Sequence, residues 1–311
     1  MRIKKRRLPW LALFCAWAAH GWPEAVSPSE AWVAISISEL REGYDTIWAV
    51  SDVHGRLREL RHLLRAADLA VPAPDGSEMR WKPGLSRQLF LVVGDSIVGG
   101  PDSRGVILLL KKLQPEAAAA GSRVIVLLGN HEAGFLARLH GVPDDDVSAF
   151  IRGMPVAAFV GSWMFAHSGY IDAPNDEESL RAYFAKVASD WTRGEYGALL
   201  GRRSILESHN WWARPARRSK VQKRLRTLGL DGLVFGHDPD ALGLRKSIAI
   251  DADGWLIKID TGLKTRASKG MLLRCEVGRI LRGAHLAMMD QGSPTCQATK
   301  PDGSAMEIPV R

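Results

Sequence analysis

Blocks of apolar residues alternate along the chain with segments of helical spacing. The runs at 46–51, 88–93 and 124–128 are short, nearly continuous and rich in aliphatic residues, which is typical of buried parallel strands. Helical patterns follow these runs, at 57–69, at about 103–113 and from about residue 133. A strand followed by a helix, three times in succession, predicts a βαβαβ unit with a parallel sheet.

The second half of the chain has shorter apolar runs and predicts a mixed or antiparallel sheet. A hairpin is expected from strands at 156–160 and 163–166, turned at Gly161-Ser162. The other expected elements are helices starting at 144–146 and covering 176–200 and 218–228, and strands at 233–235, 247–250, 255–259, 271–275 and about 278–281. We expect residues 22–45 to be loosely ordered and residues 71–87, which contain several prolines and glycines, to form a surface loop.

Polar residues that can bind metals come directly after the first three strands. Asp52 and His54 follow the first strand, Asp95 the second, and Asn130 and His131 the third. The carboxyl ends of parallel strands lie at one edge of a sheet, where ligands of open α/β folds bind, so we expect these side chains to converge. The segment 129–132 taken alone is also compatible with a loop that leads into a helix cap.

Two later histidines extend this group, since His167 follows the predicted hairpin and His237 follows the strand at 233–235. Carboxylate, imidazole and amide groups make a mixed nitrogen and oxygen donor set, which suits Mn, Fe or Zn better than Ca. The set is larger than one ion needs, so we expect two divalent metal ions with Asp95 between them. Such a pair activates water and clamps a phosphoryl group, which favours hydrolysis without a covalent enzyme intermediate.

Taken in order, five short motifs resemble those of the calcineurin-like metallophosphoesterase superfamily. They are Asp52-Val53-His54-Gly55, Gly94-Asp95, Gly129-Asn130-His131-Glu132, His167-Ser168-Gly169 and Gly236-His237. Two further segments resemble the phosphoprotein-phosphatase branch, and the Shewanella-like bacterial phosphatases most of all: Gly100-Pro101-Asp102-Ser103 and Ile259-Asp260-Thr261-Gly262. The resemblance covers about residues 47–265.

This resemblance implies a fold and a domain organisation. The fold would be α/β (α+β), a four-layer αββα sandwich of two mixed sheets flanked by helices. The metallophosphoesterase domain would span 46–289, and 290–311 would be a peripheral C-terminal tail.

The resemblance also implies the site residues and the reaction. One metal ion would be held by Asp52, His54 and Asp95, and the other by Asp95, Asn130, His167 and His237. A hydroxide activated by the two metals would hydrolyse phosphate monoesters, as in serine/threonine phosphatases, while His131 protonates the leaving alcohol or steadies the phosphate. The catalytic residues would thus be His131 and Asp95. Asn130, His131 and Arg214 would contact the substrate, a phosphoprotein or a small phosphate ester.

Two positions depart from the pattern of that branch. Its second motif usually reads Gly-Asp-x-x-Asp-Arg-Gly, whereas this chain has Val98 and Gly99 in place of the second Asp and the Arg. That Asp commonly orients the catalytic histidine and that Arg commonly grips the phosphate, so both functions should be weakened or altered here. Arg214 resembles a second phosphate-binding Arg of the branch, although a surface Arg packed on Trp212 would give the same pattern.

These departures leave two alternatives to a monoester phosphatase. A site without that Asp and Arg could accept other phosphate esters, which would make the protein a phosphodiesterase or a nucleotide hydrolase. Alternatively, the protein could bind metal and phosphate esters with only weak activity. The metal ligands themselves are unchanged in this sequence, so metal binding is common to all three hypotheses.

Composition and charge add a prediction about location. The 311 residues are 46% hydrophobic and 24% charged, as in ordinary globular proteins, and the formal charge is +8. Basic residues at 2–7 precede an apolar stretch at 8–19, which is shorter than the ~20 residues of a membrane span and typical of a signal peptide. We expect a signal peptide at 1–21, with cleavage as late as residue 25, and an exported protein, periplasmic or secreted. An uncleaved anchor is the alternative.

The net charge and the cysteines lead to predictions about binding partners and a disulfide. Without residues 1–21 the chain carries only +3, because this segment contains five basic residues and no acidic ones. We therefore expect no nucleic-acid partner, and contact with membranes only through the signal segment. Cys15 lies in that segment, whereas Cys275 and Cys296 are expected to form one disulfide in an oxidising compartment, with two free thiols as the alternative.

Overall fold

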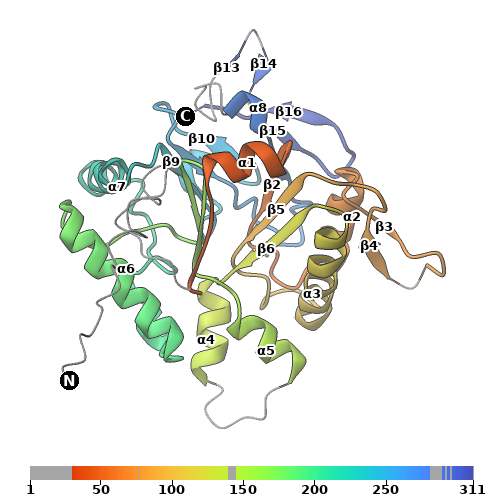
Figure 1. Cartoon of the computed structure of the whole chain (residues 1–311), viewed down its shortest axis with the longest axis horizontal. Helices are drawn as coiled ribbons and strands as arrows, with labels where there is room; N and C mark the ends of the chain where they lie inside the picture. The colour runs from red at the N-terminus through yellow and green to blue at the C-terminus, as the bar shows by residue number, and fades with distance from the viewer. Residues whose placement is uncertain are drawn as a thin grey trace, which may run out of the picture.

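The computed structural model describes residues 30–76, 78–138, 145–280, 289–290, 293–294 and 296–310. The predicted signal peptide lies outside these residues. Two six-stranded sheets pack face to face, and helices cover their outer faces (Figure 1). Aliphatic residues of both sheets, among them Leu91, Ile125, Val234 and Ile257, form the layer between them. The predicted four-layer αββα sandwich is therefore confirmed.

One sheet, named here the β2 sheet, has the strand order β16-β15-β12-β2-β5-β6. β2 (Thr46–Val50), β5 (Gln88–Val93) and β6 (Arg123–Leu127) run parallel, which confirms the predicted βαβαβ unit. α2 (Leu57–Ala66) and α3 (Ser103–Ala119) connect these strands, and their apolar side chains are part of the hydrophobic core. β12 (Leu272–Glu276) pairs with the other edge of β2 in the antiparallel direction.

The other sheet, named here the β9 sheet, has the strand order β1-β7-β8-β9-β11-β10 and is mixed, as predicted. β7 (Ala157–Val160) and β8 (Trp163–Ala166) form the predicted hairpin. β9 (Gly232–Phe235) runs parallel to β8 and to β11 (Leu256–Lys258), and β10 (Ala249–Ile250) is antiparallel to β11. The region predicted to be helical at 176–200 consists of two pieces, α6 (Glu177–Thr192) and η3 (Tyr196–Leu199).

Two segments that we expected to be irregular contain regular structure. In the described part of 22–45, β1 (Trp32–Ile35) pairs with β7, and α1 (Ile37–Gly43) follows it. Ser36 and Glu39 form a capping box at the start of α1, which is a helix signal that can be read in the sequence. Around the loop predicted at 71–87, β3 (Ala70–Pro72) and β4 (Met79–Trp81) form a small hairpin.

Several helices extend beyond their apolar pattern. α3 continues through Pro115 to Ala119, because alanine favours a helix even where no leucine faces the core. α4 (Asn130–Arg138) starts three residues before its apolar face, and α7 (Pro215–Thr227) starts at a proline, which is favoured in the first turn. α5 (Asp146–Arg152) is capped by Asp145, as the acidic triplet predicts; Asp144 lies outside the described residues. A 3-10 turn, η4 (Ala241–Gly243), follows β9.

The C-terminal part differs most from the prediction. The strand expected at about 278–281 is wrong, because α8 (Val277–Ile280) is a helical turn. β15 (Cys296–Thr299) pairs with β12 instead, and β16 (Ala305–Glu307) pairs with β15. β13 (Met289–Asp290) and β14 (Ser293–Pro294) form a separate pair. Within 290–311, β15 and β16 extend the β2 sheet, so this part of the chain is not the peripheral tail that we expected.

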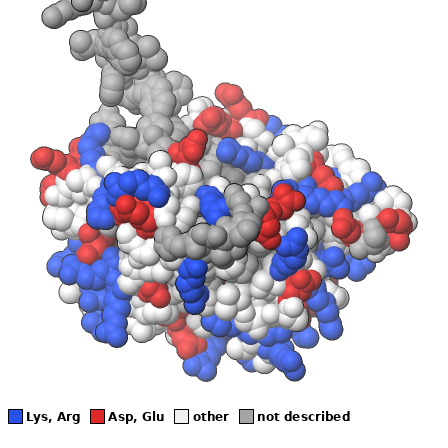
Figure 2. Space-filling model, turned by 90° about the horizontal axis from the view of Figure 1, so that it is seen from below, with Lys and Arg blue, Asp and Glu red and all other residues white. Residues whose placement is uncertain are grey.

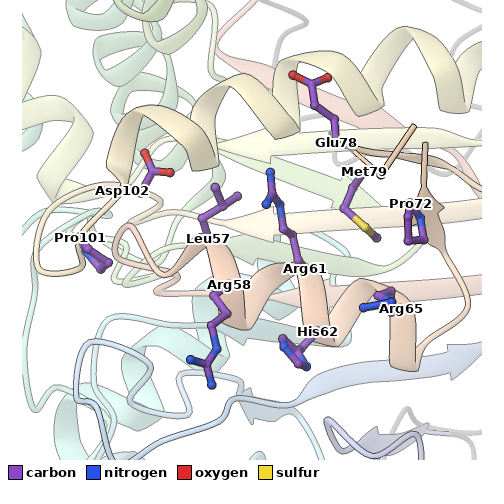
Figure 3. Close-up of a pocket in the computed structure, with 11 residues that line it drawn as sticks. Leu57, Arg58, Arg61, His62, Arg65, Pro72, Glu78, Met79, Pro101 and Asp102 are labelled. Carbon is purple, nitrogen blue, oxygen red and sulfur yellow. The ribbon is translucent and has the colours of Figure 1, made fainter. Parts of the chain in front are cut away.

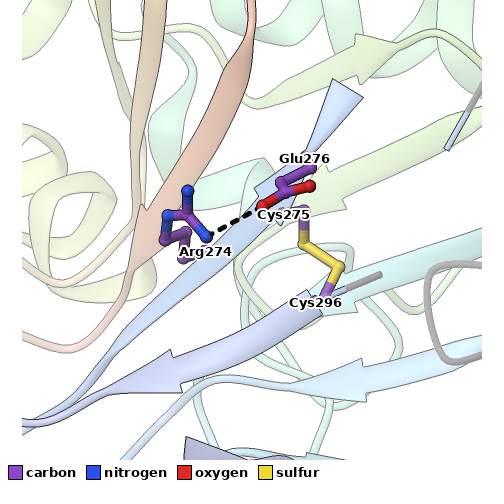
Figure 4. Close-up of a disulfide and its surroundings, with 4 residues drawn as sticks. All are labelled: Arg274, Cys275, Glu276 and Cys296. Carbon is purple, nitrogen blue, oxygen red and sulfur yellow. Dashed lines mark hydrogen bonds and ion pairs between the residues drawn. A yellow bond between two sulfur atoms is a disulfide. The ribbon is translucent and has the colours of Figure 1, made fainter. Parts of the chain in front are cut away.

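Cys275 of β12 and Cys296 of β15 form the expected disulfide between neighbouring strands (Figure 4). Both cysteines are buried in the layer between the sheets, whereas Arg274 and Glu276 on either side of Cys275 form an ion pair. The disulfide links the C-terminal strands to the strand beside β2. Within the described ranges, no helix combines the length and the apolar composition that crossing a membrane requires.

Candidate metal centre

The predicted site residues lie at the carboxyl ends of strands from both sheets. In the β2 sheet, Asp52 and Asp95 lie just beyond the ends of β2 and β5, and Asn130 begins the helix after β6. In the β9 sheet, His167 follows β8 and His237 lies just beyond β9. These five side chains line or contact one cluster, so the structure brings together residues that are far apart in the sequence.

The backbone around this cluster is in the left-handed region at four non-glycine residues. φ is 55° at Asp52, 49° at His54, 51° at Asp95 and 68° at His237. This conformation costs about 1 kcal/mol or more per residue, and such strain is concentrated at functional sites. Gly94 has a φ of 77°, and a Cβ atom added there would lie only 2.5 Å from Nδ1 of His167. A glycine is therefore required where β5 turns into the site.

The Asp95 carboxylate lies at the centre of the cluster. Its Oδ1 is 3.3 Å from Nε2 of His167, and its Oδ2 is 3.7 Å from Nε2 of both His54 and His131. Asp95 therefore belongs to two possible metal-binding groups, one with His54 and His131 and one with His167 and His237. Within each group the ligand atoms lie within 4.8 Å of one another. Asp52 adjoins the first group, with Oδ1 3.6 Å from Nε2 of His54.

Asn130 and His237 complete the second group. The Oδ1 atom of Asn130 is 3.0 Å from Nε2 of His167, and Nδ1 of His237 is 3.2 Å from the same nitrogen. His237 Nε2 is buried and has no hydrogen-bond partner in the described part of the chain. A buried imidazole nitrogen without a partner, beside buried carboxylates, needs a cation or an added donor. The residues present therefore fit divalent metal ions.

The charges in the cluster support the same interpretation. Burial alone would raise the pKa of Asp95, but the charge of His167 holds that pKa well below its usual value. Burial would lower the pKa of His167, yet Asp95 and Asp52 raise it to about 10. Burial and the charge of His167 lower the pKa of His237 to about 3, so its imidazole is neutral. The two buried carboxylates therefore stabilise a positive charge in this cluster, and a divalent cation would replace the His167 proton, because a histidine ligand must be neutral.

Glu132 holds the two loops of the β2 sheet together, a role that the sequence analysis did not assign. The side chain is fully buried, and its Oε2 accepts hydrogen bonds from the backbone N–H groups of Asp95 and Gly129, both at 3.0 Å. Oε1 accepts from the backbone N–H of Ile97 at 3.0 Å. Burial, with the nearby Asp95 charge, raises the pKa of Glu132 to about 7. A glutamate in the first turn of a helix is a sequence signal for such backbone contacts.

Other backbone contacts orient the histidines. Nδ1 of His54 is 2.7 Å from the carbonyl oxygen of Val98, and Nδ1 of His167 is 3.1 Å from that of Val93. The backbone N–H of His237 donates to Oδ2 of Asp52 at 2.9 Å, which links the two sheets. Contacts of this kind fix the ring orientation of metal ligands.

The cluster opens into a pocket of about 410 Å³ whose lining includes Asp260 and three residues that the sequence analysis did not single out: His209, Lys246 and Lys264. The ring of His209 lies 3.9 Å from that of His237. Arg214 is exposed at the start of α7 and is not one of the lining residues, so the structure does not support its predicted contact with substrate. Trp211 before it is buried, and the chain turns outward from there.

A separate groove of about 580 Å³ lies beside α2 (Figure 3). Its charged residues are mostly arginines, including Arg58, Arg61 and Arg65, and it contains one histidine, His62. Basic and acidic side chains are both present over the face seen in Figure 2. Its carboxylates, Glu78 and Asp102, and His62 are not among the described groups whose ligand atoms lie close enough together to hold a metal ion, so we assign the candidate metal centre to the cluster around Asp95.

Comparisons with known proteins agree with this site. The calcineurin-like phosphoesterase family matches residues 45–241. The chain is 29% identical over 150 residues to a symmetrical bis(5'-nucleosyl)-tetraphosphatase of Methylococcus capsulatus, which covers 43% of this chain and 46% of that protein. It is 33% identical over 84 residues to Shewanella-like protein phosphatase 2 of Arabidopsis thaliana, which covers 27% of this chain and 20% of that protein. The chain therefore matches less than half the length of these two relatives.

Solved structures share the fold. A cold-active protein-tyrosine phosphatase of a psychrophilic Shewanella species has a TM-score of 0.63 at 17% identity, covering 91% of this chain and 83% of that one. A protein serine/threonine phosphatase of Saccharomyces cerevisiae has a TM-score of 0.54 at 14% identity, covering 86% and 81%. The match to the family covers more than half of the chain and contains Asp52, Asp95, Asn130, His167 and His237. The chain belongs to the calcineurin-like phosphoesterase family.

Proposed function

We propose that this chain hydrolyses phosphate monoesters with the help of two divalent metal ions. The observation that supports this best is the position of the Asp95 carboxylate, which is shared by two groups of nitrogen and oxygen ligands. We propose the predicted ligand sets: Asp52, His54 and Asp95 for one ion, and Asp95, Asn130, His167 and His237 for the other. Mn, Fe or Zn suits these donors.

Divalent ions bound in such a site polarise phosphoryl oxygens and activate water. The protein side chains position and protonate the substrate. Asp95 orients His131, because its Oδ1 accepts the backbone N–H of His131 at 3.0 Å. The His131 side chain is 24% exposed, against 5% for His54, so it can reach a substrate in the pocket. Burial lowers the pKa of His131 below its usual value, so the neutral imidazole predominates near neutral pH, while the imidazolium fraction is a stronger acid toward a leaving alcohol.

A nucleotide hydrolase is the second candidate. Lys246 and Lys264 line the pocket, and neither forms an ion pair with a carboxylate among the described residues. Two free cations could bind further phosphate groups of a polyphosphate chain. One of the relatives is a tetraphosphatase of bis(5'-nucleosyl) substrates, which is in line with this alternative.

A protein with weak activity is the third candidate. Val98 is 42% exposed and offers no carboxylate to His131, and Gly99 offers no guanidinium to a phosphate. Metal binding would then persist without efficient turnover.

One set of assays distinguishes these candidates. The purified protein, loaded with Mn, is tested on an aryl phosphate monoester, an aryl phosphate diester, a phosphopeptide and a symmetrical dinucleoside tetraphosphate. Monoester hydrolysis that is lost in Asp95→Asn and kept in the surface variant Glu178→Gln supports the first proposal. Preference for the diester or the tetraphosphate supports the second. Two bound metal ions with no turnover of any ester support the third and contradict the other two.

We also propose that the protein is exported. The basic and apolar pattern at 1–21 and the Cys275–Cys296 disulfide both favour an oxidising compartment outside the cytoplasm. Cell fractionation and N-terminal sequencing of the mature protein test this. Recovery of the uncleaved chain from the cytoplasm would contradict it.

A further inference from the structure

The side chain of Lys264 occupies the space beside Gly99, which has no side chain. A Cβ atom added at Gly99 would lie 3.2 Å from Cγ of Lys264 and 3.6 Å from its Cε. The φ angle of Gly99 is 113°, which favours glycine over any other residue. The aliphatic part of Lys264 therefore packs where a side chain at position 99 would begin.

The ammonium group of Lys264 is directed at the candidate metal centre. Its Nζ lies 3.3 Å from Nε2 of His131, and Lys264 lines the same pocket as Asp52, His54 and Asp95. No carboxylate in the described part of the chain forms an ion pair with it. A cation whose neighbour is an imidazole, and not an acid, has donors left for an anionic ligand.

The backbone that carries Lys264 is fixed relative to the cluster. Nη2 of Arg56, two residues after His54, donates to the carbonyl oxygen of Lys264 at 2.8 Å. Thr265 donates to the carbonyl oxygen of Gly262 through its backbone N–H at 3.0 Å and its hydroxyl at 2.9 Å. A turn that is held in this way loses little conformational freedom when its side chain binds a ligand.

We propose that Lys264 binds the phosphate group of the substrate, together with His131. The inference rests on the proposed function, because it assumes that a phosphate ester enters this pocket. The bond is a charge-assisted N–H···O contact from Nζ to a phosphoryl oxygen. A lysine acts as a point charge, whereas an arginine binds two oxygens in a fixed plane, so Lys264 should constrain the orientation of the ester less.

The test measures binding of inorganic phosphate to the metal-loaded full chain by calorimetry, and KM and kcat for an aryl phosphate monoester. Lys264→Ala should weaken phosphate binding about tenfold or more and raise KM similarly, as expected for loss of a charged hydrogen bond. Lys269→Ala is the matched control, since Lys269 is exposed in the same loop and does not line the pocket. It should stay within about twofold of the wild type. Metal content and Tm are measured for every variant.

A pair of variants tests the spatial argument about Gly99. Gly99→Arg alone should reduce phosphate binding, because the new side chain crowds Lys264 and because the φ of 113° is strained for any residue other than glycine. Gly99→Arg combined with Lys264→Ala should bind phosphate more tightly than Lys264→Ala alone, since the arginine can enter the vacated space.

Two results separate this inference from the proposed function. Unchanged phosphate affinity in Lys264→Ala, at normal metal content and Tm, overturns the inference even if the wild type hydrolyses monoesters. If the wild type hydrolyses no ester but loses phosphate binding in Lys264→Ala, the proposed function fails and the binding role of Lys264 stands. A wild type that binds no phosphate at all overturns the inference as well.

Discussion

Glu132→Gln tests whether one buried carboxylate holds the two metal loops together. The change keeps the size of the side chain but replaces one of its two acceptor oxygens by an NH₂ group. Oε2 accepts two backbone N–H groups, from Asp95 and Gly129, and Oε1 accepts one, from Ile97. The less costly orientation of the glutamine therefore places its amide oxygen at the position of Oε2 and leaves its NH₂ group facing the N–H of Ile97.

The structure gives the expected size of the effect. Two donors then face each other in a site that is fully buried, and each unsatisfied donor costs about 1–3 kcal/mol. The two remaining bonds, from the N–H groups of Asp95 and Gly129, go to a neutral amide oxygen and are each weaker by about 1 kcal/mol. We expect Glu132→Gln to lower the free energy of unfolding by about 4 kcal/mol or more, and by about 2 kcal/mol if the loops relax. The metal affinity should fall too, because the loop that carries Asp95 loses one of its anchors.

Urea denaturation followed by circular dichroism measures the stability, and titration of the apoprotein with Mn measures the affinity. Glu178→Gln on the exposed side of α6 is the matched control and should change stability by less than about 0.5 kcal/mol. If Glu132→Gln unfolds at the wild-type urea concentration and binds Mn normally, the proposed role of Glu132 is refuted.

Three other changes test neighbouring parts of the structure. Asp95→Asn removes the carboxylate shared by both ligand groups, so the Mn content measured by elemental analysis should fall from two ions to one or none; two tightly bound ions would contradict the shared-ligand proposal. Cys296→Ser opens a disulfide between residues 21 positions apart and should reduce stability by about 3 kcal/mol under oxidising conditions, with no effect once the wild type is reduced. Gly94→Ala adds a Cβ 2.5 Å from His167 at a φ of 77°, and should lower both Tm and Mn affinity; a wild-type Tm would show that β5 can turn without glycine.

Much of the fold was predictable because its strands are buried on both faces. The run 88–93 is apolar after Gln88, and the observed β5 has the same bounds. The hairpin of β7 and β8 was predictable for the same reason, together with its turn at Gly161. The prediction failed where a short element depends on partners far away in the chain. β15 pairs with β12 across residues that the sequence pattern does not link, and β1 pairs with β7 more than a hundred positions later.

With the exception of Arg214, the predicted site residues come together. The end of each buried strand fixes where the residues directly after it lie. Asp95 and His237 both lie just beyond the end of a buried strand, and little else determines where they lie. Lys264 and His209 come from irregular loops whose course is set by packing, so no periodic pattern identified them. The prediction that Arg214 contacts substrate relied on a motif-like segment, Trp211-Trp212-Ala213-Arg214. The ring of Trp211 is buried and Arg214 is exposed to solvent, so the structure does not support that prediction.

The cluster around Asp95 straddles the junction of the two sheets, with Asp52, Asp95 and Asn130 contributed by one and His167 and His237 by the other. In the proposed ligand sets, the ion held by Asp95, Asn130, His167 and His237 would cross-link the two sheets, which are the two halves of the domain, because neither sheet alone supplies all four of its ligands. Such ions bind the native state and not the denatured chain, so their concentration should set how firmly the halves stay docked. Metal supply would then govern the lifetime of this protein as well as its chemistry.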